Sequence, residues 1–304
     1  MASNALDGWN FALFSLEIIL NVAFLPIVFL LFYICITQRN LHLNFRIILI
    51  FIGIGYLLGD IHRLILVISR MCCIANAVTQ IVNDIAVVQT VGLYLSVFGW
   101  PLVIVERAIA SVLCSRYDRH YGGFRVTLAL CTVYLLLVAT LTCIRTLRLY
   151  ANIDMFFMIL QIVIVVVSFV AILAIIKLNS VAYRKRHDRR LQLKDRYRLD
   201  ENIRGGKYIV PVAANAVACK TVFIALMMYS LFFTDIPLGQ DTTHLSHAYD
   251  LLFAYERVFF GVALTVRSEK FDSLMKRERR AAKVVHRQEG AATTYHNDLR
   301  QMWA

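Results

Sequence analysis

Eight charged residues stand out because they lie inside long apolar runs of the sequence or directly at the end of one. Glu106 and Arg107 are adjacent and close one such run. Six others lie within runs: Asp60, Arg63, Lys220, Asp250, Glu256 and Arg257. An isolated charge at mid-bilayer costs about 2.5–3.5 kcal/mol on insertion scales, so in a membrane these side chains should face the interior of a helix bundle and find partners. Two interpretations fit them: ion pairs that bridge helices, or the floor of a ligand pocket that includes Asp60, Lys220 and Asp250.

Spacing along the helices predicts which of these charges meet. Counted from the nearest basic residue outside each run, at about 1.5 Å per residue, Asp60 lies roughly 21 Å deep, Lys220 roughly 20 Å, and Glu256 and Arg257 roughly 15–16 Å. We therefore expect Asp60 to pair with Lys220, or Glu256 to pair with Arg63 or Lys220. Neighbouring helical residues point about 100° apart, so Glu256 and Arg257 should not be each other's main partner.

The elements that position these charges are long apolar helices. Of the 304 residues, 59% are hydrophobic and only 17% are charged, which is too little polar surface for a soluble protein of this length. Runs of this length cross a bilayer as helices, because the backbone groups must be satisfied within the segment. Seven such runs are predicted, at residues 11–36, 47–68, 85–105, 126–144, 155–176, 208–233 and 248–266. The predicted fold class is an all-α membrane protein with a seven-transmembrane helix bundle in one domain, residues 1–280.

The distribution of basic residues predicts the orientation of this bundle. Of the 32 Lys and Arg residues, 26 lie on one side of the runs, three lie on the other side, and three lie within runs. Because basic loops stay in the cytoplasm, the N-terminus is expected outside and the C-terminus inside the cell. Glu106 and Arg107 then lie at the cytoplasmic mouth of the third run. They either simply end a helix or form a latch that holds neighbouring helices until a ligand shifts the bundle.

The predicted cytoplasmic side carries most of the formal charge of +12. The connection between the fifth and sixth runs holds eleven basic and four acidic residues, and its leucines suggest helical extensions of both runs. Such a segment attracts anionic lipid of the inner leaflet or docks a cytosolic partner. Residues 268–280 are expected to form an amphipathic helix on the same leaflet, and residues 281–304 a disordered tail. Because topology accounts for the charge, no nucleic-acid partner is expected.

Two motifs are similar to those of nematode serpentine chemoreceptors. "WPLVIVERAIASVLCSRYD" at residues 100–118 resembles the exit of their third span, and "DRYRLDENIRGGKYIVP" at residues 195–211 resembles the entrance to their sixth. The resemblance is greatest to class epsilon, with classes alpha and b as near alternatives. It implies a seven-helix receptor that binds a small chemical ligand in the outer half of the bundle and activates a heterotrimeric G protein. The implied location is the plasma membrane of a sensory neuron, in its cilium.

The resemblance also assigns roles to particular residues. Glu106 and Arg107 occupy the place of the acid–arginine switch of rhodopsin-like receptors, although the tyrosine of that motif is replaced by Ala108. This favours the latch interpretation. A disulfide near the outer end of the third span is common in such receptors, and Cys73 with Cys143 is the pairing that the sequence leaves open. The basic residues implied at the G-protein interface are Arg116, Arg119, Arg184, Lys185, Arg186, Arg189, Arg190 and Arg204.

Three other functions are possible for a polytopic membrane protein: an enzyme, a transporter and a ligand-gated channel. An enzyme would need a nucleophile or a metal site, and only His244 and His247, with Asp241 and Asp250 near them, offer metal-binding residue types. We therefore expect neither an enzyme, nor a cofactor, nor a bound metal. A transporter should show internal repeats, and none is convincing. A channel of the insect odorant-receptor type should have its N-terminus inside, against the basic-residue count. A transporter or ligand-gated channel remains the alternative function.

Overall fold

Seven α-helices and one short π-helix make up the computed structural model, which describes residues 8–37, 42–72, 75–112, 124–147, 153–187, 193–234 and 244–268. No strand occurs within these ranges. In chain order the elements are α1 (Gly8–Thr37), α2 (Leu43–Met71), α3 (Ala75–Val112), α4 (Phe124–Thr146), α5 (Ile153–His187), α6 (Leu193–Tyr229), η2 (Ser230–Thr234) and α7 (His244–Val266). The all-α bundle predicted from the sequence is confirmed.

The helices extend beyond the predicted apolar runs. Helices α5 and α6 continue into the basic connection as far as His187 and from Leu193 onward, and α3 continues to Val112. Six helices are long and apolar enough to cross a membrane by length and composition. Helix α7 is the exception among the seven: it is as long as α4, at 23 residues, but it carries three charges, Asp250, Glu256 and Arg257. Its place in the bundle depends on how these charges are paired.

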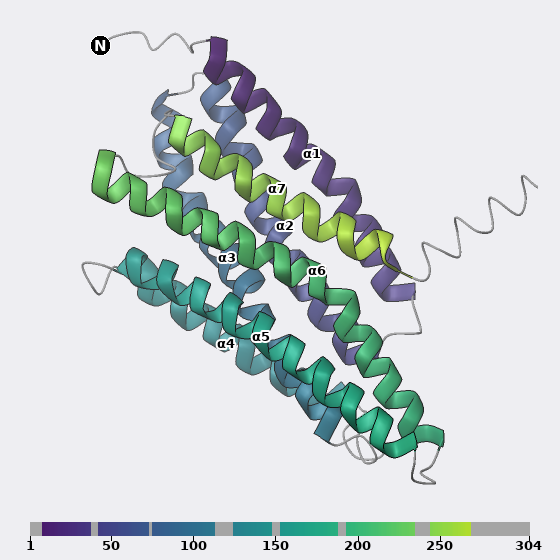
Figure 1. Cartoon of the computed structure of the whole chain (residues 1–304). Helices are drawn as coiled ribbons and strands as arrows, with labels where there is room; N and C mark the ends of the chain where they lie inside the picture. Colours follow the sequence, from purple (N-terminus) through teal and green to yellow (C-terminus); the bar gives the residue numbers. More distant parts are fainter. Residues whose placement is uncertain are drawn as a thin grey trace, which may run out of the picture.

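The bundle is arranged around α3, which contacts α2, α4, α5 and α6. Helix α7 lies between α1 and α6, so the first and last of the described helices are neighbours (Figure 1). Helices α2 and α3 approach most closely at two glycines. A Cβ atom at Gly55 would lie 2.6 Å from the backbone nitrogen of Ser96, and one at Gly92 would lie 2.8 Å from the carbonyl oxygen of Gly55. Only glycine fits this crossing.

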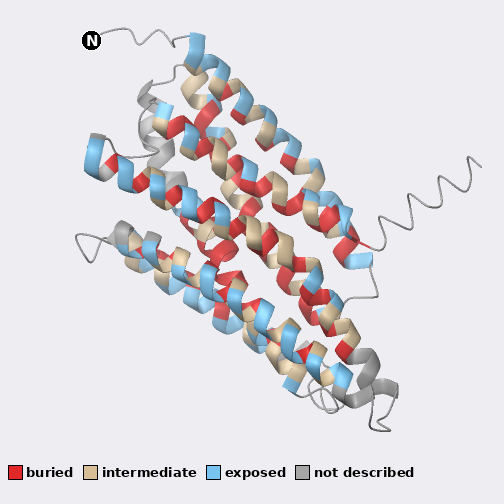
Figure 2. Ribbon diagram, viewed as in Figure 1, coloured by how far each residue is buried: buried red, intermediate tan, exposed pale blue. Residues whose placement is uncertain are grey.

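Burial follows the pattern of a membrane bundle rather than that of a soluble one. Buried residues line the surfaces where helices meet, and the outward surfaces of α4 and α5 are largely exposed (Figure 2). These exposed surfaces are apolar, as shown by Val133, Leu136, Phe156, Val167 and Val170. Contiguous apolar surface of this kind is unfavourable in water but favourable in lipid. The fold therefore places apolar side chains outward and its ionised side chains in the interior.

Candidate functional site

Seven ionised residues are buried in the predicted outer half of the bundle, each with at most 6% of its surface exposed. They come from α1, α2, α6 and α7, and they are Glu17, Asp60, Arg63, Lys220, Asp250, Glu256 and Arg257. Six of them are the intramembrane charges singled out in the sequence. A buried charge is stable only when it is paired and hydrogen-bonded. Each of the seven has an opposite charge within 3.2 Å, in three ion-paired junctions, although neither oxygen of Asp60 receives a hydrogen bond from a described residue.

The first junction joins three helices through Arg63 of α2. Its Nη2 lies 2.8 Å from Oε1 of Glu17 on α1 and 2.6 Å from Oδ2 of Asp250 on α7. Its Nε also donates to Oε1 of Glu17 at 2.9 Å. One guanidinium therefore holds two carboxylates from two other helices, which suits the planar fork of arginine.

The second junction is built on Arg257 of α7. Its Nε lies 3.2 Å from Oδ1 of Asp60 on α2, and its Nη2 donates to Oδ1 of Asn21 on α1 at 2.8 Å. The same three helices are thus linked a second time, about one turn from the first junction on α1 and α2 and about two turns from it on α7. Helix α7 is consequently fixed against α1 and α2 at two levels.

The third junction links α6 to α7. Nζ of Lys220 lies 3.0 Å from Oε2 of Glu256, and the hydroxyl of Tyr56 on α2 donates to Oε1 of Glu256 at 3.3 Å. The ammonium group also lies over two aromatic rings, 4.7 Å from the centroid of Phe223 and 4.8 Å from that of Phe253. Cation–π contacts of this kind gain strength where water is excluded.

These pairings agree only partly with those expected from spacing. The pair of Lys220 with Glu256 is present, but Asp60 pairs with Arg257 rather than with Lys220, and Arg63 does not pair with Glu256. The reason is direction around α7: Glu256 points to α6 while the next residue points to α1 and α2. Depth alone did not reveal this.

Glu17 was missed in the sequence reasoning. It carries the only formal charge in the run 11–36, and that isolation was the signal that could have identified it. A single carboxylate in a long apolar run needs a cationic partner on another helix, and Arg63 is that partner.

A cavity of about 120 Å³ lies among the three junctions. Helices α2, α3, α4, α6 and α7 contribute its lining, which consists of Gly55, Tyr56, Gly59, Arg63, Gln89, Gly92, Leu93, Ser96, Arg145, Lys220, Tyr249, Asp250, Phe253 and Arg257. Lys220 and Asp250, expected at the floor of a pocket, line it, whereas Asp60 is fully buried behind it. The cavity is large enough for a small organic molecule.

A second, more open cavity lies between α1 and α7 near the predicted outer end. Trp9, Leu13, His244, His247, Ala248 and Leu251 line it. The indole nitrogen of Trp9 donates to Nδ1 of His244 at 3.2 Å, and the ring of His247 packs on Phe14 at 4.7 Å. Across the described parts of the chain, no group of three or more His, Cys, Asp or Glu residues is placed to hold a metal ion. Asp241 lies outside the described residues.

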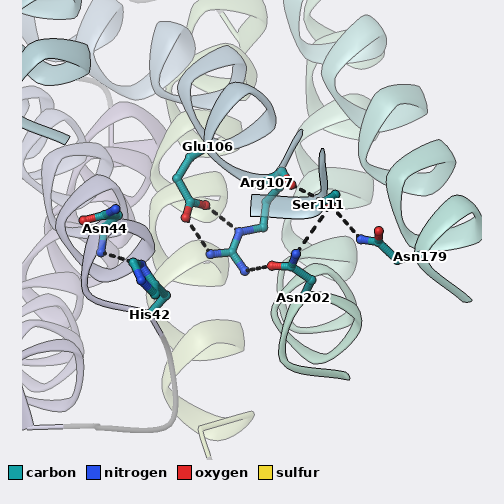
Figure 3. Close-up of polar contacts among 7 residues, drawn as sticks. All are labelled: His42, Asn44, Glu106, Arg107, Ser111, Asn179 and Asn202. Atoms are coloured by element: carbon teal, nitrogen blue, oxygen red, sulfur yellow. Dashed lines mark hydrogen bonds and ion pairs between the residues drawn. The ribbon is translucent and has the colours of Figure 1, made fainter. Parts of the chain in front are cut away.

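At the predicted cytoplasmic mouth, Glu106 and Arg107 form a two-point ion pair on α3 (Figure 3). Nε of Arg107 lies 2.5 Å from Oε2 of Glu106, and Nη2 lies 2.8 Å from Oε1. Nη1 donates to Oδ1 of Asn202 on α6 at 3.0 Å. The guanidinium also lies 4.4 Å from the ring centroid of Phe45 on α2. Both charged residues are buried, so they do more than end a helix.

The same mouth is closed further by Ser111, one turn beyond Arg107. Its hydroxyl accepts from the side-chain amides of Asn179 on α5 at 2.9 Å and of Asn202 on α6 at 3.4 Å, and it donates to the carbonyl of Arg107 at 2.7 Å (Figure 3). Helices α3, α5 and α6 are therefore joined at this point. Asn202 and Ser111 lie within the two quoted motifs, but the sequence reasoning assigned them no role.

Gly205 allows α6 to approach this pair closely. A Cβ atom there would lie 2.9 Å from Nη1 of Arg107, so a side chain would compete for the space that the guanidinium occupies. The close approach brings Asn202, three residues earlier on α6, within hydrogen-bonding distance of Arg107.

The remaining predicted residues are mostly peripheral. Arg184 is exposed on α5, and Arg204 is exposed on α6 in an ion pair with Asp200 at 3.1 Å. Cys143 is exposed near the end of α4. The residues that lie outside the described parts of the chain are Cys73, Arg116, Arg119, Arg189, Arg190 and the predicted amphipathic helix and tail from residue 269 onward. Lys185 and Arg186 lie on α5, but their side chains are not described.

Comparison with known families decides what this bundle is. The family model described as "Serpentine type 7TM GPCR receptor class ab chemoreceptor" matches residues 10–301, nearly the whole chain. The chain belongs to this serpentine chemoreceptor family. The receptor is accordingly a multi-pass membrane protein of a receptor family and not of an enzyme family. Among curated proteins, no match is found.

The match corrects one expectation and bears out the coarser one. The resemblance to nematode serpentine chemoreceptors is confirmed, but the matched class is ab and not epsilon. Classes alpha and b were the near alternatives. The two quoted motifs were sufficient to recognise a serpentine chemoreceptor, but they did not identify its class.

Proposed function

We propose that this receptor is a chemosensory G-protein-coupled receptor that binds a small chemical ligand in the 120 Å³ cavity. Binding would activate a heterotrimeric G protein at the opposite end of the bundle. The observation that carries the proposal is that α6 connects the two sites. Lys220 of α6 lines the cavity, and Asn202 of the same helix holds Arg107 at the inner mouth. The two residues are eighteen positions apart, or about 27 Å along a helix.

The proposed mechanism is a change in the position of α6. A ligand shifts a conformational equilibrium only by as much as its affinity differs between the two states. A ligand that contacts Lys220 alters the link between α6 and α7, and a displacement of α6 separates Asn202 from Arg107. Pro211 lies inside α6 between the two sites and interrupts its hydrogen-bond ladder, so it provides a hinge.

The released Arg107 is the proposed contact for the G protein. In the structure its guanidinium is engaged by Glu106, Asn202 and Phe45. The basic residues of α5 and α6 that extend past the bundle would surround the docking site, with the inner leaflet of the plasma membrane beside them. By family resemblance, the receptor acts in the cilium of a sensory neuron.

The test is nucleotide exchange on purified heterotrimeric G proteins by membranes that bear the receptor. Exchange that requires both the receptor and one member of a panel of volatile and water-soluble compounds would support the proposal. No exchange with any G protein, from a receptor shown to be folded, would contradict it and would favour a transporter or a ligand-gated channel.

Two variants test the latch in the same assay. Arg107→Ala is expected to abolish exchange while surface expression is kept. Asn202→Ala is expected to raise exchange in the absence of ligand, because it removes the bonds with Arg107 and Ser111 that hold α6 against α3. Thr140→Ala is the matched control, since its exposed hydroxyl bonds only to a carbonyl of its own helix. Loss of expression in both latch variants would instead show that the pair is purely structural.

A further inference from the structure

We propose that the 120 Å³ cavity selects a small organic anion, a carboxylate of about the size of benzene or smaller. This inference rests on the proposed function, because it names the chemical class of the ligand for the same site. It is carried by which charged groups reach the cavity and which lie behind it.

The ionised groups that line the cavity are mainly cationic. Arg63, Arg145, Lys220 and Arg257 line it, against one carboxylate, Asp250. The carboxylates that balance these cations are Glu17, Asp60 and Glu256, and none of them lines the cavity. The four cations and the four carboxylates therefore balance in number. All four cations line the cavity, whereas three of the four carboxylates do not. Such an arrangement stabilises an anion in the cavity and repels a cation.

The one lining carboxylate is already engaged. Oδ2 of Asp250 lies 2.6 Å from Nη2 of Arg63, and Asp250 is only 4% exposed. To reach Asp250, the ammonium group of a ligand would have to displace the guanidinium of Arg63 from this buried ion pair, and breaking a buried ion pair is costly. The cavity therefore offers no counter-ion to a cationic ligand.

Lys220 offers hydrogen-bond donors that the protein leaves unused. An ammonium group has three N–H donors, and among the described residues only Oε2 of Glu256 accepts from it. Lys220 is 5% exposed, so its ammonium group is shielded from bulk water, and it lines the cavity beside the rings of Phe223 and Phe253. A carboxylate placed there would form a charge-assisted hydrogen bond, which is roughly twice as strong as a neutral one.

Arg257 supplies a second donor next to a glycine. Its Nε faces Asp60 and its Nη2 donates to Asn21, while its Nη1 lies 3.9 Å from the position of a Cβ atom at Gly59. Gly59 therefore leaves space on the cavity side of the guanidinium, which any side chain would reduce. Lys220 and Arg257 come from α6 and α7, so a bound carboxylate would contact both helices and alter the link between them on which the proposed mechanism depends.

The size of the cavity limits the rest of the ligand. A cavity of about 150 Å³ in another protein holds benzene, and this one is slightly smaller at about 120 Å³. The apolar part of its lining is Leu93 and Phe253, with the rings of Tyr56 and Tyr249. A short aliphatic carboxylate fits both the volume and this mixture of groups.

The test compares three compounds of similar shape and different charge. Purified full-length receptor is titrated with butyrate, butyramide and butylammonium up to millimolar concentration, with binding followed by saturation-transfer NMR. Butyrate is expected to bind at least about tenfold more tightly than the amide, and butylammonium is expected not to bind. Equal binding of acid and amide, preference for the amine, or no butyrate binding at all would overturn the proposal.

Two matched variants identify the donor. Glu256→Gln keeps a hydrogen-bond acceptor for Lys220 and is expected to retain butyrate binding. The double variant Lys220→Met with Glu256→Gln removes both charges of the pair, so no unpaired ion is left buried, and it is expected to weaken butyrate binding by about tenfold or more. Equal butyrate binding by the two variants would show that Lys220 is not the donor and would refute the assignment.

A third comparison tests the place of binding. Gly59→Ala is expected to weaken butyrate binding, since its added methyl group meets only Nη1 of Arg257 and otherwise occupies the cavity. Gly8→Ala is its control, because a Cβ atom there has no neighbour within 4 Å. Unchanged binding in both would place the anion elsewhere.

Failure of this inference is distinguishable from failure of the proposed function. If butyrate binds as expected but no compound drives nucleotide exchange, the ligand class stands and the coupling to a G protein is wrong. If amines or neutral compounds drive exchange and carboxylates do not, the receptor function stands and the ligand class is wrong.

Discussion

The substitution Arg63→Met gives the sharpest test of the buried junctions. Arg63 is 6% exposed and lies within 2.8 Å of carboxylate oxygens from two other helices. Its removal leaves Glu17 and Asp250 as unpaired buried charges. Breaking a single buried ion pair typically costs about 3–5 kcal/mol, so the free energy of unfolding should fall by at least about 3 kcal/mol. At about 2–4 °C per kcal/mol for a chain of this general size, the midpoint of thermal unfolding in detergent should fall by about 6 °C or more.

The same measurement contains its own controls. The triple variant Arg63→Met, Glu17→Gln, Asp250→Asn removes all three charges and should recover most of the loss, since replacing a whole buried ionic group is often nearly neutral. Arg204→Met breaks an exposed pair with Asp200, where both side chains are nearly half exposed, and should cost about 0.3–0.5 kcal/mol. If Arg63→Met behaves like Arg204→Met, or if the triple variant is as unstable as the single one, the junction does not stabilise the bundle and the reasoning is refuted.

Three further predictions concern the latch and the packing of the bundle. Asn202→Ala should raise ligand-independent nucleotide exchange without loss of surface expression, and a lower basal rate would show that its bond to Arg107 supports the active state. Gly92→Ala should destabilise the receptor by about 1–3 kcal/mol, because the added Cβ atom would lie 2.8 Å from backbone atoms of α2. Gly59→Ala is the comparison, since a Cβ atom there lies no closer than 3.9 Å to another group. Equal thermal midpoints for the two variants would contradict the close crossing of α2 and α3. Tyr208→Phe removes the hydrogen bond from the tyrosine hydroxyl to the carbonyl of Leu264, which joins α6 to α7. It should lower the free energy of unfolding by about 0.5–1.5 kcal/mol, measured by thermal unfolding. An unchanged thermal midpoint would show that this bond does not stabilise the receptor.

Most of the fold could be predicted from hydropathy because lipid imposes a simple rule on each segment separately. Every helix must satisfy its own backbone, so six of the seven predicted runs lie within a single α-helix, and the sixth, 208–233, continues from α6 into the π-helix η2. The leucines of the basic connection indicated that α5 and α6 extend beyond their runs, but the end points of α3, α5 and α6 could not be predicted in the same way, because these ends leave the apolar region and are no longer constrained by it. Glu17 shows a second limit. A single charge in an otherwise apolar run is easily taken for an incidental residue, whereas this one is the ion-pair partner of Arg63.

The pairings were less predictable because they depend on rotation about each helix axis. Depth placed Asp60, Lys220 and Glu256 near one level, but it could not tell which faces meet across the bundle. The inner mouth shows the same limit. Glu106 and Arg107 were identified from their adjacency, whereas Asn202 required knowledge of how α6 packs against α3. Polar residues inside a recognised motif are informative only once a partner on another helix is known.

The three charges of α7 have a consequence for how the receptor is assembled. Taken alone, a helix with Asp250, Glu256 and Arg257 would be expensive to move into lipid, at about 2.5–3.5 kcal/mol for each central charge. Its partners Arg63, Lys220 and Asp60 lie on helices that the ribosome has already produced. Insertion of α7 into the membrane is therefore coupled to its packing against the helices that carry these partners. A nascent chain that stops before α7 exposes unpaired charges to the bilayer interior, which gives the cell's quality-control machinery a clear difference between a finished receptor and an unfinished one.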